Sequence, residues 1–323
     1  MNVKRAIGGF ALSFVFLAFF AYAIFGLQQF LSGFLFGQNK SSLSASIFDA
    51  AQNSAPQNAS NVSPQTISAL KVNAASAISI WADNPNPDKV LFSKNVDTKL
   101  SIASISKLMT ALVVIDNYDL SQQIVISDKA ANQTIEPDQL KAGEKFYVKD
   151  LLYAMLIGSD NTASYALSEG VPLGSDINKF VDLMNEKATE LGLSNTSFSN
   201  PTGLGLSNFS TVQDLIKFSE YLLKNHPSIL GITTMPEFDL YTVDGKTLHK
   251  IINTDELLND SSGLVGRIIG GKTGDTKTAG ECLLLVVKPI DRQGYFINVI
   301  LNSDDRFGEM KKIINWADTT YQR

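Results

Sequence analysis

Cysteine and histidine are scarce in this 323-residue chain, which contains one cysteine, Cys282, and two histidines, His226 and His249. The chain therefore cannot form an internal disulfide or assemble the common zinc sites of His and Cys ligands, and we expect no metal. Two isolated histidines also give little support to serine–histidine catalysis. We expect Cys282, in "ECLLLVV", to be a small buried hydrophobe and His226, in "KNHPS", to follow a helix.

Basic charge is not concentrated anywhere in the chain. The formal net charge is −5, and lysine and arginine are scattered. Without a basic stripe interleaved with aromatic residues, we expect no nucleic-acid partner. The stretch "GRIIGGKT", which ends at Thr273, satisfies the bare pattern of a phosphate-binding loop. The residues after it, "GDTKTAGECLLLVV", indicate a turn and a strand instead of the required helix, so nucleotide binding is not expected.

One long hydrophobic run is present, at the N-terminus. Ala6 to Leu27 is about twenty apolar residues, which is long enough to cross a bilayer as a helix. Lys4 and Arg5 precede it, so the positive-inside rule places the N-terminus in the cytoplasm and the rest of the chain outside. The alternative is a signal peptide cleaved after "AYA", Ala21 to Ala23. The apolar stretch continues to Phe36 and favours an uncleaved, single-pass anchor in the cell membrane.

Three regions follow from composition. We expect a membrane anchor or signal peptide over residues 1–37 and a flexible polar linker over 38–66, which is rich in Ser, Asn, Gln and Ala. We expect the third region, residues 67–323, to be a folded domain on the extracytoplasmic side.

The pattern of this domain predicts an α+β fold. Ala75–Ala82 and Lys89–Asn95 are β-rich runs separated by the turn signal "DNPNPD", and they predict a hairpin. Ser104 to about Asn117 predicts a buried helix, and further helices fill the central region. Three β-like stretches and a helix over about Arg306–Tyr321 follow. We therefore expect one antiparallel sheet, built from both ends of the chain and covered by helices.

A lysine lies in apolar surroundings in "SISKLMTAL". Ser104 and Lys107 are three residues apart and share one face of the predicted helix. Backbone N–H groups at a helix start favour developing negative charge, and burial lowers the pKa of a lysine so that it can accept a serine proton. The alternative is a serine N-cap beside a lysine that extends its amine to solvent.

Two other polar stretches interrupt the apolar pattern. Ser159-Asp160-Asn161 follows Gly158 at a tight break between two predicted helices, where Asp160 is also a good N-cap. Lys272-Thr273-Gly274 lies in "GGKTGD", where a lysine and a hydroxyl can bind a carboxylate. Its glycines allow another backbone to approach closely.

The order S-x-x-K, S-D-N, K-T-G, at separations of roughly 55 and 113 residues, is typical of class A β-lactamases and penicillin-binding proteins. From about Ala75 onward the chain resembles the low-molecular-mass penicillin-binding proteins, which are serine-type D-alanyl-D-alanine carboxypeptidases. "ASISKLMTAL" and "GGKTGDTKTAGECLLLV" carry this resemblance. The segment Thr196–Leu204 distinguishes the chain from a β-lactamase, and Glu190 does not keep the spacing of a β-lactamase's deacylating glutamate.

The resemblance implies the following catalytic roles. Ser104 attacks the penultimate carbonyl of a peptidoglycan stem peptide that ends in D-Ala-D-Ala, and Lys107 acts as the base. Ser159 helps to relay the proton to the leaving D-alanine. β-Lactams act as inhibitors that acylate Ser104, and no cofactor is implied.

The resemblance also implies substrate-binding roles. Asn161 binds the peptide, and Lys272, Thr273 and Gly274 form the strand that holds the terminal carboxylate. The backbone N–H groups of Ser104 and Asp275 form an oxyanion hole.

Two residues depart from the family's common motifs. Asp160 stands where glycine is usual, and Asp275 places an acid directly after the third motif, where it is expected to weaken carboxylate binding. A DD-endopeptidase and a β-lactamase remain alternatives, and a weakly active penicillin-binding sensor or scaffold is a third. The N-terminal span is expected to replace the C-terminal membrane helix of many members.

Overall fold

The centre of the molecule is a five-stranded antiparallel sheet. The computed structural model describes residues 70–82, 89–133, 140–170, 176–205, 207–261 and 263–321. The strand order is β2-β1-β11-β10-β9, so the predicted hairpin and the sheet made by both ends of the chain are confirmed. The strands are β1 (Ala74–Ala82), β2 (Lys89–Lys94), β9 (Ile268–Thr276), β10 (Gly280–Val287) and β11 (Tyr295–Ser303).

Both faces of this sheet are buried, which explains the continuous apolar runs in β10 and β11. Side chains alternate between the two faces of a strand. In β10, Leu284 and Val286 belong to one core cluster, whereas Leu283 and Leu285 belong to the other. Cys282 lies on the same face as Leu284 and is fully buried, which confirms its expected role as a small hydrophobe.

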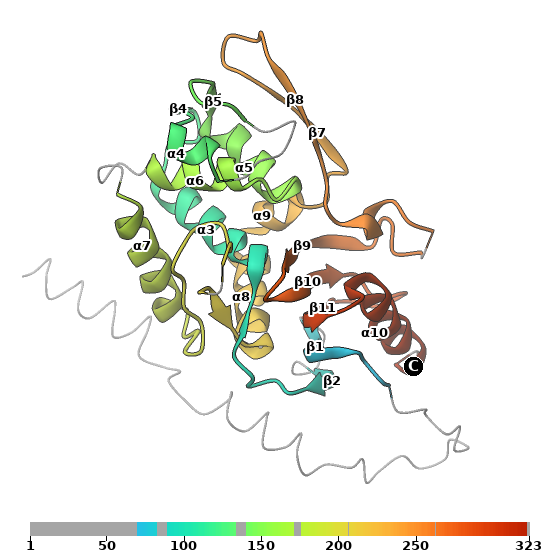
Figure 1. Ribbon diagram of the computed structural model, residues 1–323. Coiled ribbons are helices and arrows are strands. Elements are labelled where there is room, and N and C mark those ends of the chain that lie inside the picture. The colour runs from blue at the N-terminus through green and yellow to red at the C-terminus, as the bar shows by residue number, and fades with distance from the viewer. Residues whose placement is uncertain are drawn as a thin grey trace, which may run out of the picture. The chain divides into compact units, whose positions relative to one another are not determined.

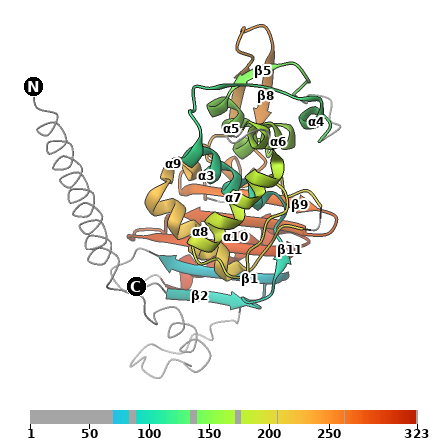
Figure 2. The ribbon, with the colours of Figure 1, turned by 90° about the vertical axis from the view of Figure 1, so that its left-hand side faces the viewer.

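Helices form a layer on each side of the sheet (Figure 1). α10 (Arg306–Thr320) packs Met310 and Ile313 on one face. On the other face, α8 (Val212–Asn225) and α9 (Pro227–Ile232) pack against the sheet, and the remaining central helices continue this helical region beyond them, as a second view shows (Figure 2). These remaining helices are α3 (Lys107–Asn117), α4 (Asp128–Ala131), α5 (Val148–Ile157), α6 (Asn161–Glu169) and α7 (Ile177–Glu190).

Short elements connect these layers. β7 and β8 form a hairpin that extends beyond α5 (Figure 1) and that the sequence analysis did not include. The turn signal "DG" between alternating residues could have revealed it. The short strands are β3 (Leu100–Ser101), β4 (Gln123–Val125), β5 (Lys145–Tyr147), β6 (Phe209–Ser210), β7 (Glu237–Tyr241) and β8 (Leu248–Ile252), and the 3₁₀ turns are η1 (Ala103–Ser106) and η2 (Glu256–Leu258).

The expected membrane segment, Ala6–Leu27, and the linker over residues 38–66 lie outside the described residues. Among the helices that the structure does describe, none combines the length and apolar character needed to cross a bilayer. The α+β domain itself has the architecture expected from the sequence.

Candidate active site

The candidate nucleophile, Ser104, lies in the 3₁₀ turn η1 and not in the first turn of an α-helix, as the sequence pattern had predicted. The helix α3 begins three residues later, at Lys107. Ala103 has a φ of +45°, a left-handed conformation that is uncommon outside glycine. This conformation displaces the start of the helix and lets other segments pack closely around Ser104.

Two glycines make that close packing possible. A Cβ atom at Gly203 would lie 2.0 Å from the carbonyl oxygen of Ala103, and one at Gly274 would lie 3.1 Å from the backbone nitrogen of Ser104. A side chain at either position would push η1 out of place. The close backbone approach expected at the third motif is therefore present, and its partner is the turn that carries Ser104.

Lys107 is fully buried, and its Nζ contacts three oxygen atoms. These are Ser104 Oγ at 2.9 Å, Asn161 Oδ1 at 2.8 Å and the carbonyl oxygen of Thr202 at 2.6 Å. Burial lowers the pKa of Lys107 well below its usual value, Lys272 lowers it further by repulsion, and Asp160 opposes both. The lowered pKa confirms what the apolar neighbours of Lys107 predict.

The hydrogen-bond partners fix the orientation of a neutral Lys107 amine. Such an amine has two N–H donors and one lone pair. The amide oxygen of Asn161 and the carbonyl of Thr202 can only accept, so they take both N–H groups. The lone pair is then directed at the hydroxyl of Ser104. This arrangement can remove the serine proton.

The carbonyl of Thr202 is a site group that the sequence analysis missed. Thr202 belongs to the "NPTGL" stretch, whose backbone is organised by Asn200. Asn200 Oδ1 accepts hydrogen bonds from the backbone nitrogens of Thr202, at 3.1 Å, and Gly203, at 2.7 Å. The resemblance included this stretch without a role. Its role here is to hold a carbonyl against Lys107.

The second motif forms the tight corner between α5 and α6 that the sequence predicts. Ser159 has a φ of +57°, and Asp160 is the N-cap of α6, accepting from the backbone nitrogen of Ala163 at 2.7 Å. Asn161 reaches Lys107 directly. Within the described residues, no hydrogen bond joins the Ser159 hydroxyl to Ser104 or to Lys107.

The third motif lies in the edge strand β9, with Lys272 and Thr273 almost fully buried. No helix follows, because the chain turns into β10. This excludes the phosphate-binding loop. Burial lowers the pKa of Lys272 to about 7, against the raising effect of the Asp255 carboxylate, and Arg306 lowers it further.

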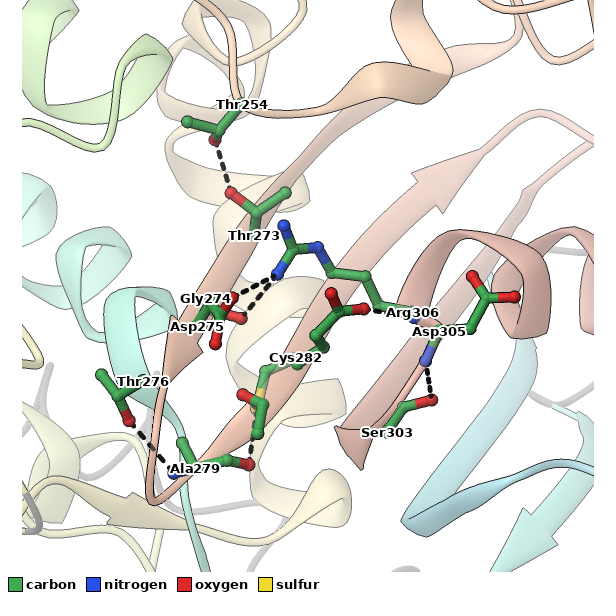
Figure 3. Close-up of polar contacts among 12 residues, drawn as sticks. Thr254, Thr273, Gly274, Asp275, Thr276, Ala279, Cys282, Ser303, Asp305 and Arg306 are labelled. Atoms are coloured by element: carbon green, nitrogen blue, oxygen red, sulfur yellow. Dashed lines mark hydrogen bonds and ion pairs between the residues drawn. The ribbon is translucent and has the colours of Figure 1, made fainter.

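Arg306, the first residue of α10, reaches the third motif from across the sheet (Figure 3). Its Nη1 donates to the carbonyl of Gly274 at 3.2 Å and lies 3.8 Å from Asp275 Oδ2. The Asp275 side chain is 59% exposed. The acid that the sequence analysis expected to oppose carboxylate binding is therefore turned to solvent and compensated by an arginine.

Asp255 is a second charged group that the sequence analysis missed. It is 6% exposed, and burial raises the pKa of its carboxyl to about 6. Its Oδ1 accepts from the backbone nitrogen of Leu257 at 3.1 Å. Only the fold brings Asp255 and Arg306 to the third motif, so the sequence carries no local signal for either role.

Other candidate chemistry finds no support in the described part of the chain. Across residues 70–321, apart from the gaps given above, no three His, Cys, Asp or Glu side chains gather as metal ligands. Glu190, the residue weighed as a deacylating base, has an exposed side chain that forms an ion pair with Lys187 at 2.8 Å. The geometry instead places the Ser104 hydroxyl against the buried Lys107 amine, near Lys272 of β9 and near Arg306, which reaches that strand from α10.

Comparison with known proteins gives concordant matches. A family model described as D-alanyl-D-alanine carboxypeptidase matches residues 63–305. The D-alanyl-D-alanine endopeptidase of Pseudomonas aeruginosa is 34% identical over 257 residues, covering 79% of this chain and 78% of that protein. The D-alanyl-D-alanine carboxypeptidase DacF of Bacillus subtilis is 33% identical over 265 residues, covering 79% of this chain and 64% of that protein. The crystal structure of the Streptomyces K15 DD-transpeptidase has a TM-score of 0.67 at 29% identity, covering 77% of this chain and 98% of that one.

Proposed function

The chain belongs to the family of serine-type D-alanyl-D-alanine carboxypeptidases, and from this premise we propose that it removes the terminal D-alanine from peptidoglycan stem peptides through an acyl-enzyme on Ser104. One observation carries the assignment of residues. A fully buried Lys107 amine lies 2.9 Å from Ser104 Oγ, with both of its N–H groups taken by oxygens that can only accept.

Acylation follows from this geometry. Ser104 Oγ attacks the carbonyl of the penultimate D-alanine while its proton moves to Lys107 Nζ. The ammonium that forms has three N–H donors, which match the three oxygens already around it. The same contacts therefore satisfy both protonation states of the base, and little reorganisation accompanies proton transfer.

Substrate binding falls to the third motif. Lys272 and the Thr273 hydroxyl hold the terminal carboxylate, and Arg306 adds positive charge at Gly274. Asn161 binds the peptide, and the proton that Lys107 has accepted passes through the Ser159 hydroxyl to the leaving D-alanine amine. The backbone N–H groups of Ser104 and Asp275 stabilise the oxyanion. Water then attacks the acyl carbonyl and releases the shortened peptide.

Penicillin labelling tests the nucleophile. We expect Ser104→Ala to abolish the mass increase of one penicilloyl group in the intact protein, because no other hydroxyl contacts the Lys107 amine among the described residues. Ser101→Ala is the matched control, since this buried hydroxyl has no hydrogen-bond partner in the part of the chain that the structure describes, and its loss should leave labelling intact. Covalent labelling that persists in folded Ser104→Ala would show that another residue is the nucleophile.

A DD-endopeptidase is the second candidate, because the Pseudomonas aeruginosa relative carries that name. The same acylation cuts a cross-link when the leaving amine belongs to a side chain of another stem peptide. Mass analysis of products from purified monomeric and cross-linked peptidoglycan fragments separates the two. Release of free D-alanine from monomers supports the carboxypeptidase, and conversion of dimers to monomers supports the endopeptidase.

We also propose that Ala6–Leu27 anchors the protein in the membrane with its catalytic domain outside. The support is the length of the apolar run and its two preceding basic residues. N-terminal sequencing of the protein from membranes tests this. A mature terminus at Ile24 or in the linker would identify a cleaved signal peptide instead.

A further inference from the structure

One hydroxyl contacts the third motif from outside all three motifs. Thr254 Oγ1 and Thr273 Oγ1 form a hydrogen bond, and Figure 3 shows the two side chains pointing toward each other. The backbone nitrogen of Thr254 donates to the carbonyl of Ile157 at 3.2 Å, at the end of α5. Thr254 therefore contacts both the strand of the third motif and the segment that leads directly into Ser159.

The residues on either side hold Thr254 in place. Asn253 Nδ2 donates to the carbonyls of Thr233 and Met235, both at 2.8 Å. The Thr233 hydroxyl in turn accepts from the backbone nitrogen of Gly271 in β9, at 2.9 Å. Asp255, on the other side, is buried. These hydrogen bonds hold the segment around Thr254 against β9, so the Thr254 hydroxyl has a fixed position relative to Thr273.

The number of protons available shows which of the two threonine hydroxyls donates when a carboxylate is bound. Each threonine hydroxyl has one proton to donate. When Thr273 binds a carboxylate, which can only accept, its proton must point at the ligand. The Thr273 oxygen then has to accept from Thr254, which fixes the order of donors as Thr254 to Thr273 to carboxylate. Donation to Thr273 also polarises its O–H group and strengthens the outer bond.

We propose that Thr254 is a positioning residue for substrate recognition, which donates to the Thr273 hydroxyl and thereby commits its proton to the terminal carboxylate of the substrate. This inference rests on the proposed function, because it needs a carboxylate at Thr273. We therefore expect loss of the Thr254 hydroxyl to slow the hydrolysis of substrates that have a free C-terminal carboxylate. It should have little effect on the reaction at the acyl carbonyl itself.

The test compares Thr254→Val, which keeps the shape and removes the hydroxyl, with Thr254→Ser, which keeps the hydroxyl. Each full-length variant is assayed on an N-acylated L-Lys-D-Ala-D-Ala peptide and on its C-terminal amide. For the free acid we expect Thr254→Val to lower kcat/KM about tenfold, mainly through KM, which equals about 1.4 kcal/mol. For the amide we expect less than about a twofold change, on the scale set by the same relation. Thr254→Ser should restore the wild-type ratio of the two substrates.

Thr276→Val is the matched control. Its hydroxyl accepts from the backbone nitrogen of Ala279 in the β9–β10 turn, so its removal should leave the ratio of acid to amide unchanged. Thermal unfolding checks that each variant is folded, and Thr254→Ala replaces the valine variant if that one is not. An equal loss on both substrates, or no loss on either, would overturn the role of Thr254. A folded wild type that cleaves neither substrate would instead overturn the proposed function.

Discussion

The site contains two buried lysines, and their surroundings favour different protonation states of the two amines. Lys107 hydrogen-bonds to three neutral oxygens and has no carboxylate among those contacts. Lys272 lies in a strand where the buried carboxylate of Asp255 raises its pKa against the cost of burial. Burial lowers the pKa of both amines, and a nearby carboxylate opposes that shift in each case. Asp255 is buried with Lys272, whereas Asp160 is engaged as the N-cap of α6 and Lys107 is also repelled by Lys272. These surroundings favour the neutral form of Lys107, as its proposed role as a base requires, and the charged form of Lys272, as its proposed role in carboxylate binding requires.

The comparison predicts opposite pH dependences for the two lysines. Lys107 must be neutral to accept the serine proton, so acylation rises with pH through its lowered pKa. Lys272 must be charged to bind a carboxylate, so binding weakens as pH rises through a pKa of about 7. We therefore expect a bell-shaped profile of kcat/KM for substrates with a free carboxylate.

The largest effect is expected when residue 107 is made permanently charged, because this removes the difference between the two lysines. Lys107→Arg keeps the positive charge and cannot supply a neutral amine. We expect acylation by penicillin to slow by at least about 10²-fold, within the range for loss of a general base. The measurement is the second-order acylation rate between about pH 6 and 10, with circular dichroism to verify folding. A folded variant within about tenfold of wild type, or 1.4 kcal/mol in barrier, would show that Lys107 supplies only charge.

The same substitution at the other lysine should be much milder. Lys272→Arg keeps the cation that the carboxylate needs, although the larger guanidinium fits a buried strand position less well. We expect KM for the free-acid peptide to rise about tenfold at pH 7 with little change in kcat. Because arginine stays protonated, the decline on the alkaline side should disappear. An alkaline decline that persists would mean that a group other than Lys272 produces it.

The smallest expected effect removes the anion and leaves both lysines. Asp255→Asn retains an oxygen that can accept from Leu257, so the cap of η2 is preserved. Without the carboxylate, the pKa of Lys272 falls below about 7, and the alkaline limb of kcat/KM moves to lower pH. The native carboxyl titrates near 6, so wild type and variant should differ most above that pH. The pH profile of peptide hydrolysis measures this, and a limb that stays in place would contradict the support by Asp255.

Much of the fold could be predicted because its signals are local. The turn signal "DNPNPD" predicted the β1–β2 hairpin, and the apolar neighbours of Lys107 predicted both its burial and its lowered pKa. The position of Ser104 was less accurate. Its 3₁₀ turn depends on the left-handed Ala103 and on two glycines that approach from distant segments.

The missing parts of the site share a physical reason. The contact from Thr202 is a backbone carbonyl, which any residue type provides, so no sequence letter reveals it. Arg306 and Asp255 act on a strand from α10 and from the segment before η2, and their role exists only in the folded chain. Residue identity reports the chemistry of a motif well, whereas the charges that tune it are placed by tertiary structure.

The pairing of β1 with β11 has a consequence for the folding of the newly synthesised chain. This ladder joins Ala74 to Ser303 and Ala82 to Tyr295, segments more than two hundred residues apart in the chain. Such non-local pairings slow folding, and the ladder cannot form until the C-terminal strand has emerged from the ribosome. We expect Gly274 to pack against the backbone of Ser104 only when the five-stranded sheet has formed. We expect the nascent chain to stay inert toward peptidoglycan until then, so that a reactive serine appears only in a finished molecule.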